Sequence, residues 1–442
     1  MSVANTSGDK QSPGGPFRAL RHRNYRLFFT GQSVSLIGTW MQRTALGWLV
    51  LRLTGSELLL GVVAFANQIL TFPFSPVAGV LADRHDRRRM LVLTQGMAMV
   101  QALLLAALTL ANWITVWQIV MLSLLLGMVS AFDIPIRQAF NMEMVESRED
   151  LANAVAMNSF MFNGARLMGP LVAGLLIAAV GEGPCFLLNG VSFLGVIASL
   201  MAMRIARRPP TPHQAHVLHH LREGARYAFG FAPIREILLL LAVVNLVGIP
   251  YSVLMPAFAK KVLLGGPATF GILMAGSGVG AVMGAAYLAR RKNILGLARL
   301  AAVNISVFGL GLVALSWSRT LWLAVPLAML VGFCMMVSLA SCNTLVQTIV
   351  EDDKRGRVMG FYAMSFMGIA PFGALLAGGI ADVVGVPWTV TVGGIASVLT
   401  GAVFASRLPA LRKHVHPIYV KMGIVPADND AGLTVPPQEF RM

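Results

Sequence analysis

Residues 90–132 read MLVLTQGMAMVQALLLAALTLANWITVWQIVMLSLLLGMVSAF and contain no charged side chain. Similar charge-free apolar runs occupy 58–82, 237–259, 262–289, 320–350 and 383–406. Apolar runs of about 18 residues or more predict membrane-spanning helices, because a backbone in lipid must satisfy its polar groups internally. The sequence therefore predicts an all-α membrane protein that crosses the bilayer many times.

The composition excludes several other classes of protein. Of 442 residues, 56% are hydrophobic and 12% are charged, about half the charged share of a soluble domain. A soluble globular protein, a disordered tail protein and a secreted disulfide scaffold are thereby excluded. Cys185, Cys334 and Cys342 give neither a disulfide framework nor a metal-ligand spacing, so we expect no metal and no cofactor.

Breaks at glycine, proline and charge clusters divide the chain into twelve spans. We place them at 25–51, 58–82, 90–111, 116–139, 152–179, 185–203, 236–258, 268–288, 297–317, 321–345, 356–382 and 388–406. Most of the 35 Lys and Arg fall on one side of these spans, although the formal charge of +16 alone would also suit a nucleic-acid partner. The exceptions are Arg52, Lys260, Lys261 and Arg319 on the other side, and Arg43 and Arg166 within spans. Both termini are therefore expected to be cytoplasmic, and no nucleic-acid partner is expected.

The two halves of the chain repeat at an offset of about 204 residues. Trp113 pairs with Trp317 and Gly127 with Gly332, and the stretch from Gly174 runs parallel to GGIADVVGVPW from Gly378. We therefore expect two parallel six-helix repeats, the arrangement of alternating-access transporters. The expected segments are a cytoplasmic N-terminal tail (1–24), a first half (25–203), a cytoplasmic linker (204–235), a second half (236–406) and a cytoplasmic C-terminal tail (407–442).

A motif between the second and third spans reads GVLADRHDRRR over 79–89. It resembles the G-x-x-x-D-R/K-x-G-R-R/K signature of the major facilitator superfamily, with Asp86 where glycine is usual. The segments 17–42, 130–140, 165–174, 221–229 and 355–361 resemble the branch that contains the enterobactin exporter and macrolide efflux proteins. The resemblance covers about 17–407 and implies the major facilitator fold, a secondary transporter for efflux, and a multi-pass plasma (bacterial inner) membrane location.

The resemblance also implies roles for the motif residues in coupling or gating: Gly79, Asp83, Arg84, Arg87 and Arg88. Asp83 would act as a latch near the N-terminus of the eleventh span, close to 357–361, where the helix dipole favours negative charge. The resemblance further implies a relay to Asp133, at the inner end of the fourth span. Asp133 and Arg137 lie four residues apart on one helix face, and they are either a static bridge or a titratable gate.

Two arginines lie within predicted spans, where charge is costly and marks function by default. Arg43 and Arg166 either cap backbone carbonyls and amides across helices or bind an anionic substrate. Possible hydrogen-bonding and aromatic partners for a substrate are Gln32, Trp40, Asn163, Asn245 and Tyr251. Apart from Asp133, no acidic residue lies inside a predicted span, so the interior favours anionic, phenolic or neutral polar molecules over cations.

The favoured function is proton-coupled export of a small organic molecule. Protons, the substrate and the lipid bilayer are the expected partners, and the sequence contains no P-loop or attached nucleotide-binding domain. A lipid or lysolipid flippase and a non-transporting membrane receptor or scaffold remain alternatives. An enzyme is disfavoured because the spans hold no nucleophile–base pair and no metal-ligand set.

Overall fold

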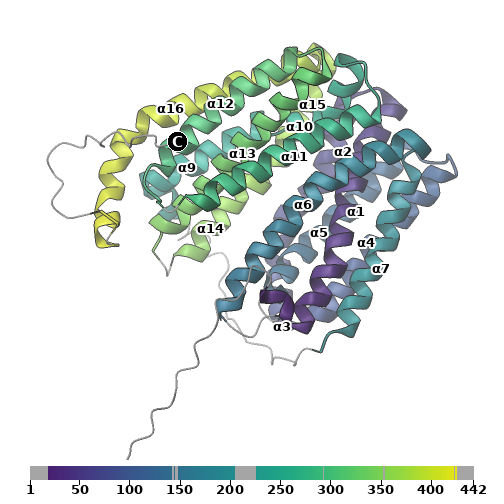
Figure 1. The fold of residues 1–442 in the computed structure, drawn as a ribbon, viewed down its shortest axis with the longest axis horizontal. Helices are drawn as coiled ribbons and strands as arrows, with labels where there is room; N and C mark the ends of the chain where they lie inside the picture. Colours follow the sequence, from purple (N-terminus) through teal and green to yellow (C-terminus); the bar gives the residue numbers. More distant parts are fainter. Residues whose placement is uncertain are drawn as a thin grey trace, which may run out of the picture.

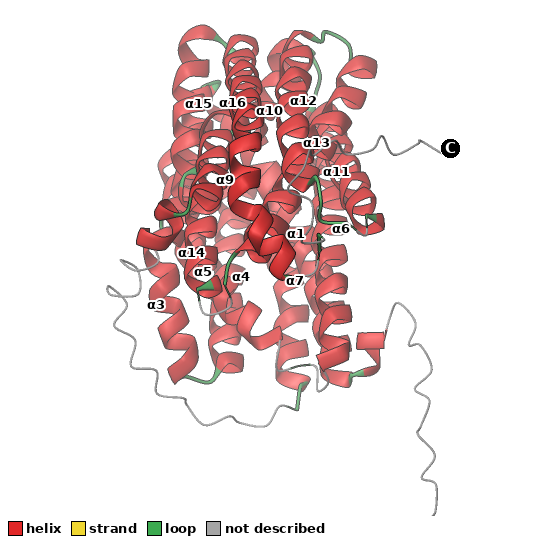
Figure 2. Ribbon diagram, turned by 90° about the vertical axis from the view of Figure 1, so that its left-hand side faces the viewer, coloured by secondary structure: helices red, strands yellow, loops and turns green. Residues whose placement is uncertain are grey.

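The computed structural model of the protein describes residues 18–141, 144, 148–204, 225–291, 293–351, 354–422 and 424–425. Within these ranges the regular structure is all helical (Figure 2). The first half, α1 to α7, contains α1 (Arg23–Thr54), α2 (Glu57–Ile69), α3 (Thr71–Arg84), α4 (Arg87–Leu110), α5 (Val116–Asn141), α6 (Arg148–Val180) and α7 (Gly183–Ala202), after the short η1 (Arg18–Arg21).

The second half, α9 to α16, begins with a long helix interrupted by two π-helical turns. Its elements are α9 (Ala232–Val243), η2 (Val244–Gly248), α10 (Tyr251–Ala257), η3 (Phe258–Val262), α11 (Pro267–Arg290), α12 (Leu297–Trp317), α13 (Leu321–Ile349), α14 (Arg355–Ala363), η4 (Met364–Gly368), α15 (Ala370–Val384) and α16 (Val386–Lys421). η4 is a third π-helical turn and joins α14 to α15.

In the described residues, 11 helices are long and apolar enough to cross a membrane. The predicted first span is α1, which is long enough at 32 residues but more polar. The second span is formed by α2 and α3, which break at Leu70. The long helices thus agree with the predicted architecture of a multi-pass α-helical membrane protein.

The two halves repeat the same pattern of helix neighbours. In the first half α1 packs against α6 and α7, and α4 packs against α5 and α7. In the second half the span formed by α9, η2 and α10 packs against α15 and α16, and α12 packs against α13 and α16. The two largest interfaces between the halves are those of α2 with α15 and of α6 with α11. The predicted parallel repeat is therefore present as a repeated packing arrangement.

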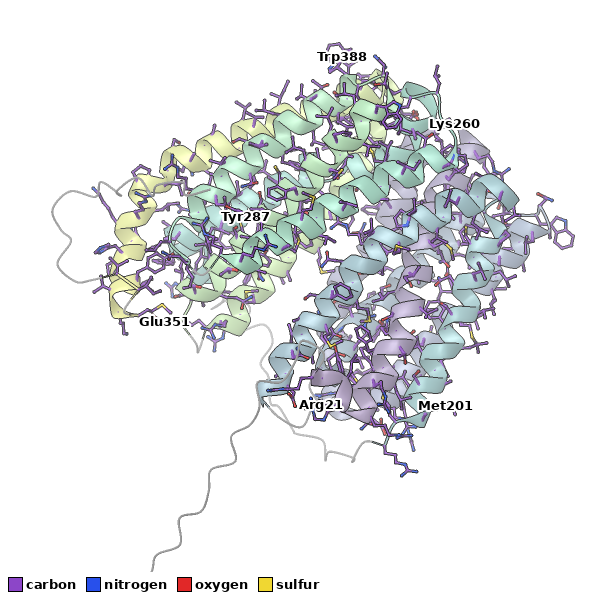
Figure 3. The ribbon with its side chains drawn as sticks, in the orientation of Figure 1. Arg21, Met201, Lys260, Tyr287, Glu351 and Trp388 are labelled. Carbon is purple, nitrogen blue, oxygen red and sulfur yellow. The ribbon has the colours of Figure 1, made fainter. Side chains whose placement is uncertain are left out.

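The halves meet at one end and diverge at the other (Figure 1). We call the meeting end the tryptophan end, because exposed Trp113, Trp117, Trp317, Trp322 and Trp388 gather in its helix ends and turns. The opposite end, where α1, α3, α4, α11 and α14 begin or finish with arginine, is the basic end. Trp388 and Lys260 lie where the halves meet, whereas Met201 and Glu351 lie at the separated tips (Figure 3).

Glycine allows the halves to touch at backbone level near the tryptophan end. A Cβ added to Gly378 would lie 2.7 Å from the Glu57 carbonyl oxygen and 2.9 Å from the Gly61 Cα. A Cβ on Gly174 would likewise lie 2.9 Å from the Gly271 Cα. Such small-residue contacts are typical of helix pairs that pack closely within membranes.

The last helix differs from the sequence expectation. We expected the final span to end at 406 and a tail to follow, but α16 continues to Lys421. Leu411 and Val415 are buried there, at the spacing of one helix face. Residues 407–421 are therefore helical and continue the last span without a break; their expected cytoplasmic location stays a prediction. The other parts of the expected tails and linker, 1–17, 205–224 and 426–442, lie outside the described residues.

A second difference concerns acidic residues. We expected none inside a span apart from Asp133, but Asp382 is the last residue of the expected span 356–382 and Glu236 is the first of 236–258. Glu236 lies inside the membrane-length helix Ala232–Val262. Its carboxylate is buried and accepts from the Arg407 guanidinium of α16 at 2.6 Å. This pair connects α9 to α16 at a helix end, and among the described residues the helix interiors at mid-depth hold no acidic side chain.

Candidate functional site

The centre of the first half holds an indole flanked by two guanidinium groups. The Cζ of Arg43, on α1, lies 4.9 Å from the centre of the Trp40 ring, and that of Arg166, on α6, lies 6.0 Å from it. Phe162 of α6 meets the same ring edge-on at 5.7 Å. Both arginines are thus in range of cation–π attraction to one tryptophan. We call Trp40, Arg43, Phe162 and Arg166 the arginine–tryptophan cluster.

A glycine on α6 explains why these side chains meet. Gly169 lies three residues after Arg166, and a Cβ there would lie 2.4 Å from the Trp40 Cβ and 3.0 Å from the Ile37 carbonyl oxygen. Only a residue without a side chain permits this approach. The α6 backbone therefore lies directly on α1 at Trp40, which brings Arg166 to the Trp40 face.

The cluster faces the second half of the molecule. Gly47 lies one turn after Arg43, and a Cβ on it would lie 3.3 Å from Pro256 of α10. A Cβ on Gly278 of α11 would lie 3.5 Å from the Arg166 carbonyl oxygen. Arg43 is nevertheless exposed in the middle of its helix, and Trp40 and Arg166 are half-buried. The guanidinium groups are therefore accessible from the region between the halves.

The other predicted binding residues lie in different surroundings. Asn163 is half-buried one turn before Arg166, where its amide donates to the Ser159 carbonyl at 2.8 Å. Tyr251 is buried, and its hydroxyl lies 3.2 Å from the Ser277 hydroxyl of α11. Asn245 is buried and donates to the Leu241 carbonyl at 2.8 Å. Gln32 is also buried, roughly 16 Å along α1 from Arg43 at 1.5 Å per residue. Neither Gln32 nor Asn245 contacts the cluster.

Asp133 is the centre of a buried polar network near the basic end. The carboxylate lies 3.2 Å from Arg137 on the next turn of α5, and it accepts from Thr94 at 3.1 Å and Gln95 at 2.7 Å on α4. Asp133 is 7% exposed. A buried carboxylate needs such partners. The sequence identified Asp133 and Arg137, but the two α4 partners were missed because only the packing of α4 on α5 brings them there.

The motif at 79–89 shapes the turn between α3 and α4. Asp86, which replaces the usual glycine, is the N-cap of α4 and accepts from the Arg89 amide at 3.1 Å, the ordinary role of aspartate at a helix start. Arg88 donates to the Met201 carbonyl at the end of α7 at 2.6 Å. Arg84 is exposed and Arg87 half-buried. The Asp83 side chain lies outside the described part of the structure.

Gly79, the first residue of the motif, has open space around it. A Cβ there would meet nothing within 4 Å, and the same holds for Gly356 and Gly360 on α14. The glycines that join the halves near the tryptophan end, Gly61 with Gly378 and Gly174 with Gly271, are in close contact, whereas Gly79, Gly356 and Gly360 at the basic end are not. This difference agrees with the separation of the halves at the basic end in Figure 1.

A polar cluster that the sequence did not predict joins the halves at the tryptophan end. Lys261 of η3 lies 2.7 Å from the Glu57 carboxylate and donates to the Gly55 carbonyl at 2.9 Å. Asp382 of α15 accepts from the Ser56 hydroxyl at 2.9 Å and from the Leu58 amide at 3.3 Å. We call these residues the end cluster. The sequence showed only four basic residues on this side and gave no indication of their partners.

A cavity of about 500 Å³ lies at the basic end of the second half. Its lining includes Arg226, Tyr227, Phe231, Lys354 and Arg357. Lys354 lies 4.6 Å from the centre of the Tyr227 ring and donates to Glu351 at 2.6 Å. This hydrogen bond holds the pKa of the Glu351 carboxyl below its usual range. Among the described residues, no group of three His, Cys, Asp or Glu is placed to hold a metal ion.

Two six-helix halves with a charged cluster between them define a secondary transporter of the major facilitator superfamily. The family model of transmembrane secretion effectors, a branch of that superfamily, matches residues 14–419. The chain belongs to this family, which is one of transporters and not of enzymes.

Several known proteins are similar over most of their length. The Staphyloferrin A transporter of Staphylococcus aureus is 25% identical over 86% of this chain and 95% of its own. The multidrug efflux pump Tap of Mycolicibacterium fortuitum is 26% identical, covering 85% and 93%. The enterobactin exporter EntS of Shigella boydii is 25% identical, covering 89% and 93%. The predicted resemblance to the enterobactin exporter branch is thus confirmed.

The fold is also similar to that of a solved transporter. The POT family transporter PepTSo aligns with a TM-score of 0.68 and 14% identity, covering 89% of this chain and 99% of that structure. At this level of identity the likeness concerns the fold alone. The predicted major facilitator fold is confirmed.

Proposed function

We propose that this protein exports a small anionic or phenolic organic molecule by alternating access, with proton antiport as the energy source. The observation that carries the substrate class is the arginine–tryptophan cluster. Two guanidinium groups share one indole and face the second half, and within the described ranges no acidic residue lies near them at mid-depth. Guanidinium groups bind carboxylates and phenolates by paired hydrogen bonds, and the aromatic rings offer a surface for a planar ring.

The similarity to siderophore and drug transporters supports a small organic substrate. The relatives include transporters named for the siderophores Staphyloferrin A and enterobactin and a pump named for multiple drugs. The positive cluster favours the acidic or phenolic class over lipophilic cations, because a buried cation would need a carboxylate to balance it.

The distribution of Lys and Arg supports a cytoplasmic basic end. In that orientation both termini are cytoplasmic, and the structure is the inward-open form, with the tryptophan end closed. The buried Asp133–Arg137 pair supports a coupling role for Asp133, because a carboxylate within a helix bundle is the usual carrier of a proton. Gly79, Asp83, Arg84, Arg87 and Arg88 would then control closure of the basic end.

Flux in inverted membrane vesicles under an imposed pH gradient tests the proposal. A catecholate siderophore, a macrolide and a lipophilic cation are compared for wild type, Arg43→Gln and Arg166→Gln. We expect both variants to reduce siderophore flux by roughly 10-fold or more, the effect of losing one charge-assisted hydrogen bond. Arg319→Gln is the matched control, since Arg319 also lies over a tryptophan, Trp317, at 5.9 Å, but at the tryptophan end.

Two results would overturn the proposal. Robust transport of the lipophilic cation that is insensitive to both variants would refute the anionic substrate class. Flux that needs no gradient, or movement of a labelled lysolipid in place of the soluble compounds, would refute proton-coupled export and would favour the flippase alternative.

A further inference from the structure

The motif at the end of α3 has a second copy at the end of α15. Residues 79–83 read GVLAD and residues 378–382 read GGIAD, so each carries glycine four residues before an aspartate. Each segment lies in the last turns of its helix, since α3 ends at Arg84 and α15 ends at Val384. At a spacing of four, glycine and aspartate share one helix face.

The two copies lie on two neighbouring spans, at opposite ends of the molecule. The span formed by α2 and α3 runs from the tryptophan end to the basic end, and the span formed by α14, η4 and α15 runs from the basic end to the tryptophan end. At each end of the molecule, therefore, the C-terminus of one of these spans lies on the same side as the N-terminus of the other. The second copy lies at the tryptophan end, where the structure is closed.

At that end both parts of the second copy make contacts across the halves. Gly378 lies against Gly61 at backbone distance. Asp382 accepts from Ser56, the N-cap of α2, and from the Leu58 amide, so its negative charge lies at the N-terminus of α2. Helix dipoles favour an anion at this position. The aspartate thus adds an electrostatic contact to a glycine contact.

Lys261, on η3, makes a further contact between the halves at the tryptophan end. Its ammonium group contacts the Glu57 carboxylate and the carbonyl of Gly55, the C-cap residue of α1. Glu57 is 4% exposed, and a carboxylate with so little exposure is stable only when paired. Asp382 and Lys261 of the second half therefore together bind the short turn between α1 and α2.

The other interface between the halves offers a comparison. α6 and α11 also meet through glycines, Gly174 and Gly271. In the sequence repeat, however, the position equivalent to Asp382 is Ala178. Close helix packing at this end thus does not require a carboxylate, and the presence of Asp382 at one interface needs a separate reason.

We infer that Asp382, with Lys261, is the positioning latch that holds the tryptophan end closed, and that 378–382 acts there as 79–83 would act at the basic end. The two aspartates serve alternating states: one latch is engaged while the other is released. In the present structure Asp382 is engaged, and a Cβ added to Gly79 would meet nothing within 4 Å.

Distances between spin labels test the latch without any substrate. Labels at Trp113→Cys and Trp322→Cys, which are 75% and 92% exposed, report the tryptophan end. Labels at Met201→Cys and Glu351→Cys report the basic end. The three native cysteines are buried and are replaced beforehand. Asp382→Ala is compared with Glu182→Gln, which removes an ion pair to Arg52 at the same end but within the first half.

We expect Asp382→Ala to lower the ratio of closed to open tryptophan ends roughly two- to fivefold, the factor that charged contacts at an exposed site contribute. The basic-end labels should move closer together in the same sample, and Glu182→Gln should leave both distributions unchanged. If Asp382→Ala does not fold, Ser56→Ala removes the donor from the opposite side and should shift both distributions in the same direction.

Unchanged distributions in both Asp382→Ala and Ser56→Ala would overturn the inference. So would an opening of the tryptophan end without approach at the basic end, because the latches would then not alternate. The measurement is independent of the proposed substrate and of proton coupling, so either proposal can fail while the other stands.

Discussion

Gly174 and Gly164 lie on the same helix, α6, and differ in what surrounds them. A Cβ on Gly174 would lie 2.8 Å from the Pro267 carbonyl oxygen and 2.9 Å from the Gly271 Cα, whereas one on Gly164 would meet nothing within 4 Å. We predict that Gly174→Ala opens the tryptophan end and that Gly164→Ala does not. The two variants add the same methyl group to the same helix, so their difference isolates the contact between halves.

The size of the effect follows from the distances. Ordinary Cβ contacts begin at 3.4 Å, and both neighbours of the Gly174 methyl are backbone atoms that cannot rotate away. The helices must therefore part by roughly 0.6 Å, and overpacking of this kind costs about 1–3 kcal/mol. That cost lowers the closed population roughly 5- to 150-fold. The helix-propensity gain of alanine, about 1 kcal/mol, is common to both variants and cancels in the comparison.

The assay is the distance between labels at Trp113→Cys and Trp322→Cys, with initial transport rate as the second readout. Gly174→Ala should broaden and lengthen the distance distribution and should slow transport, because a state needed in each cycle becomes rare. Gly164→Ala should match wild type in both. Equal distributions for the two variants would refute the claim that this glycine contact sets the closed end.

Three further predictions concern single polar groups. Asp133→Asn removes the charge that balances Arg137, so gradient-driven flux should fall to background while exchange without a gradient persists; unchanged gradient-driven flux would contradict a coupling role. Asp86→Ala removes the N-cap of α4 and should lower the free energy of unfolding by about 1 kcal/mol in detergent, whereas Asp86→Gly should cost only a few tenths. Lys354→Met should raise the pKa of Glu351 towards its ordinary value in an NMR titration; in the wild type the ion pair persists as pH falls through that ordinary value and is lost only through the lowered pKa.

Much of the fold follows from the sequence because hydropathy and charge act locally. The span expected at 297–317 coincides with α12, and the others differ mostly by a few residues at their ends. The helix of the last span continues beyond the expected boundary at 406, to Lys421. Leu408, Leu411 and Val415 share one face of this extension and pack on the core of the second half, a tertiary contact that charge patterning alone does not indicate.

The sequence predicted some residues of the candidate site but not the contacts between them. Arg43 and Arg166 stood out because charge is rare in apolar spans, but their shared contact with Trp40 depends on Gly169, which places α6 on α1. The end cluster was missed for a different reason. Its partners lie 206 and 326 residues apart in sequence, and no local pattern indicates which carboxylate will meet which cation across two domains.

The extension of α16 bears on how the chain can be shortened for experiments. A truncation after residue 406, the expected end of the last span, would remove Leu411 and Val415 from the core. It would also remove Arg407, which forms an ion pair with the buried Glu236. We expect such a protein to aggregate on extraction, because apolar surface of the second half would become exposed and the Glu236 carboxylate would lose its ion-pair partner. Affinity tags and fluorescent fusions therefore belong after residue 425, beyond the last turn of described structure, where they leave the helix and its contacts intact.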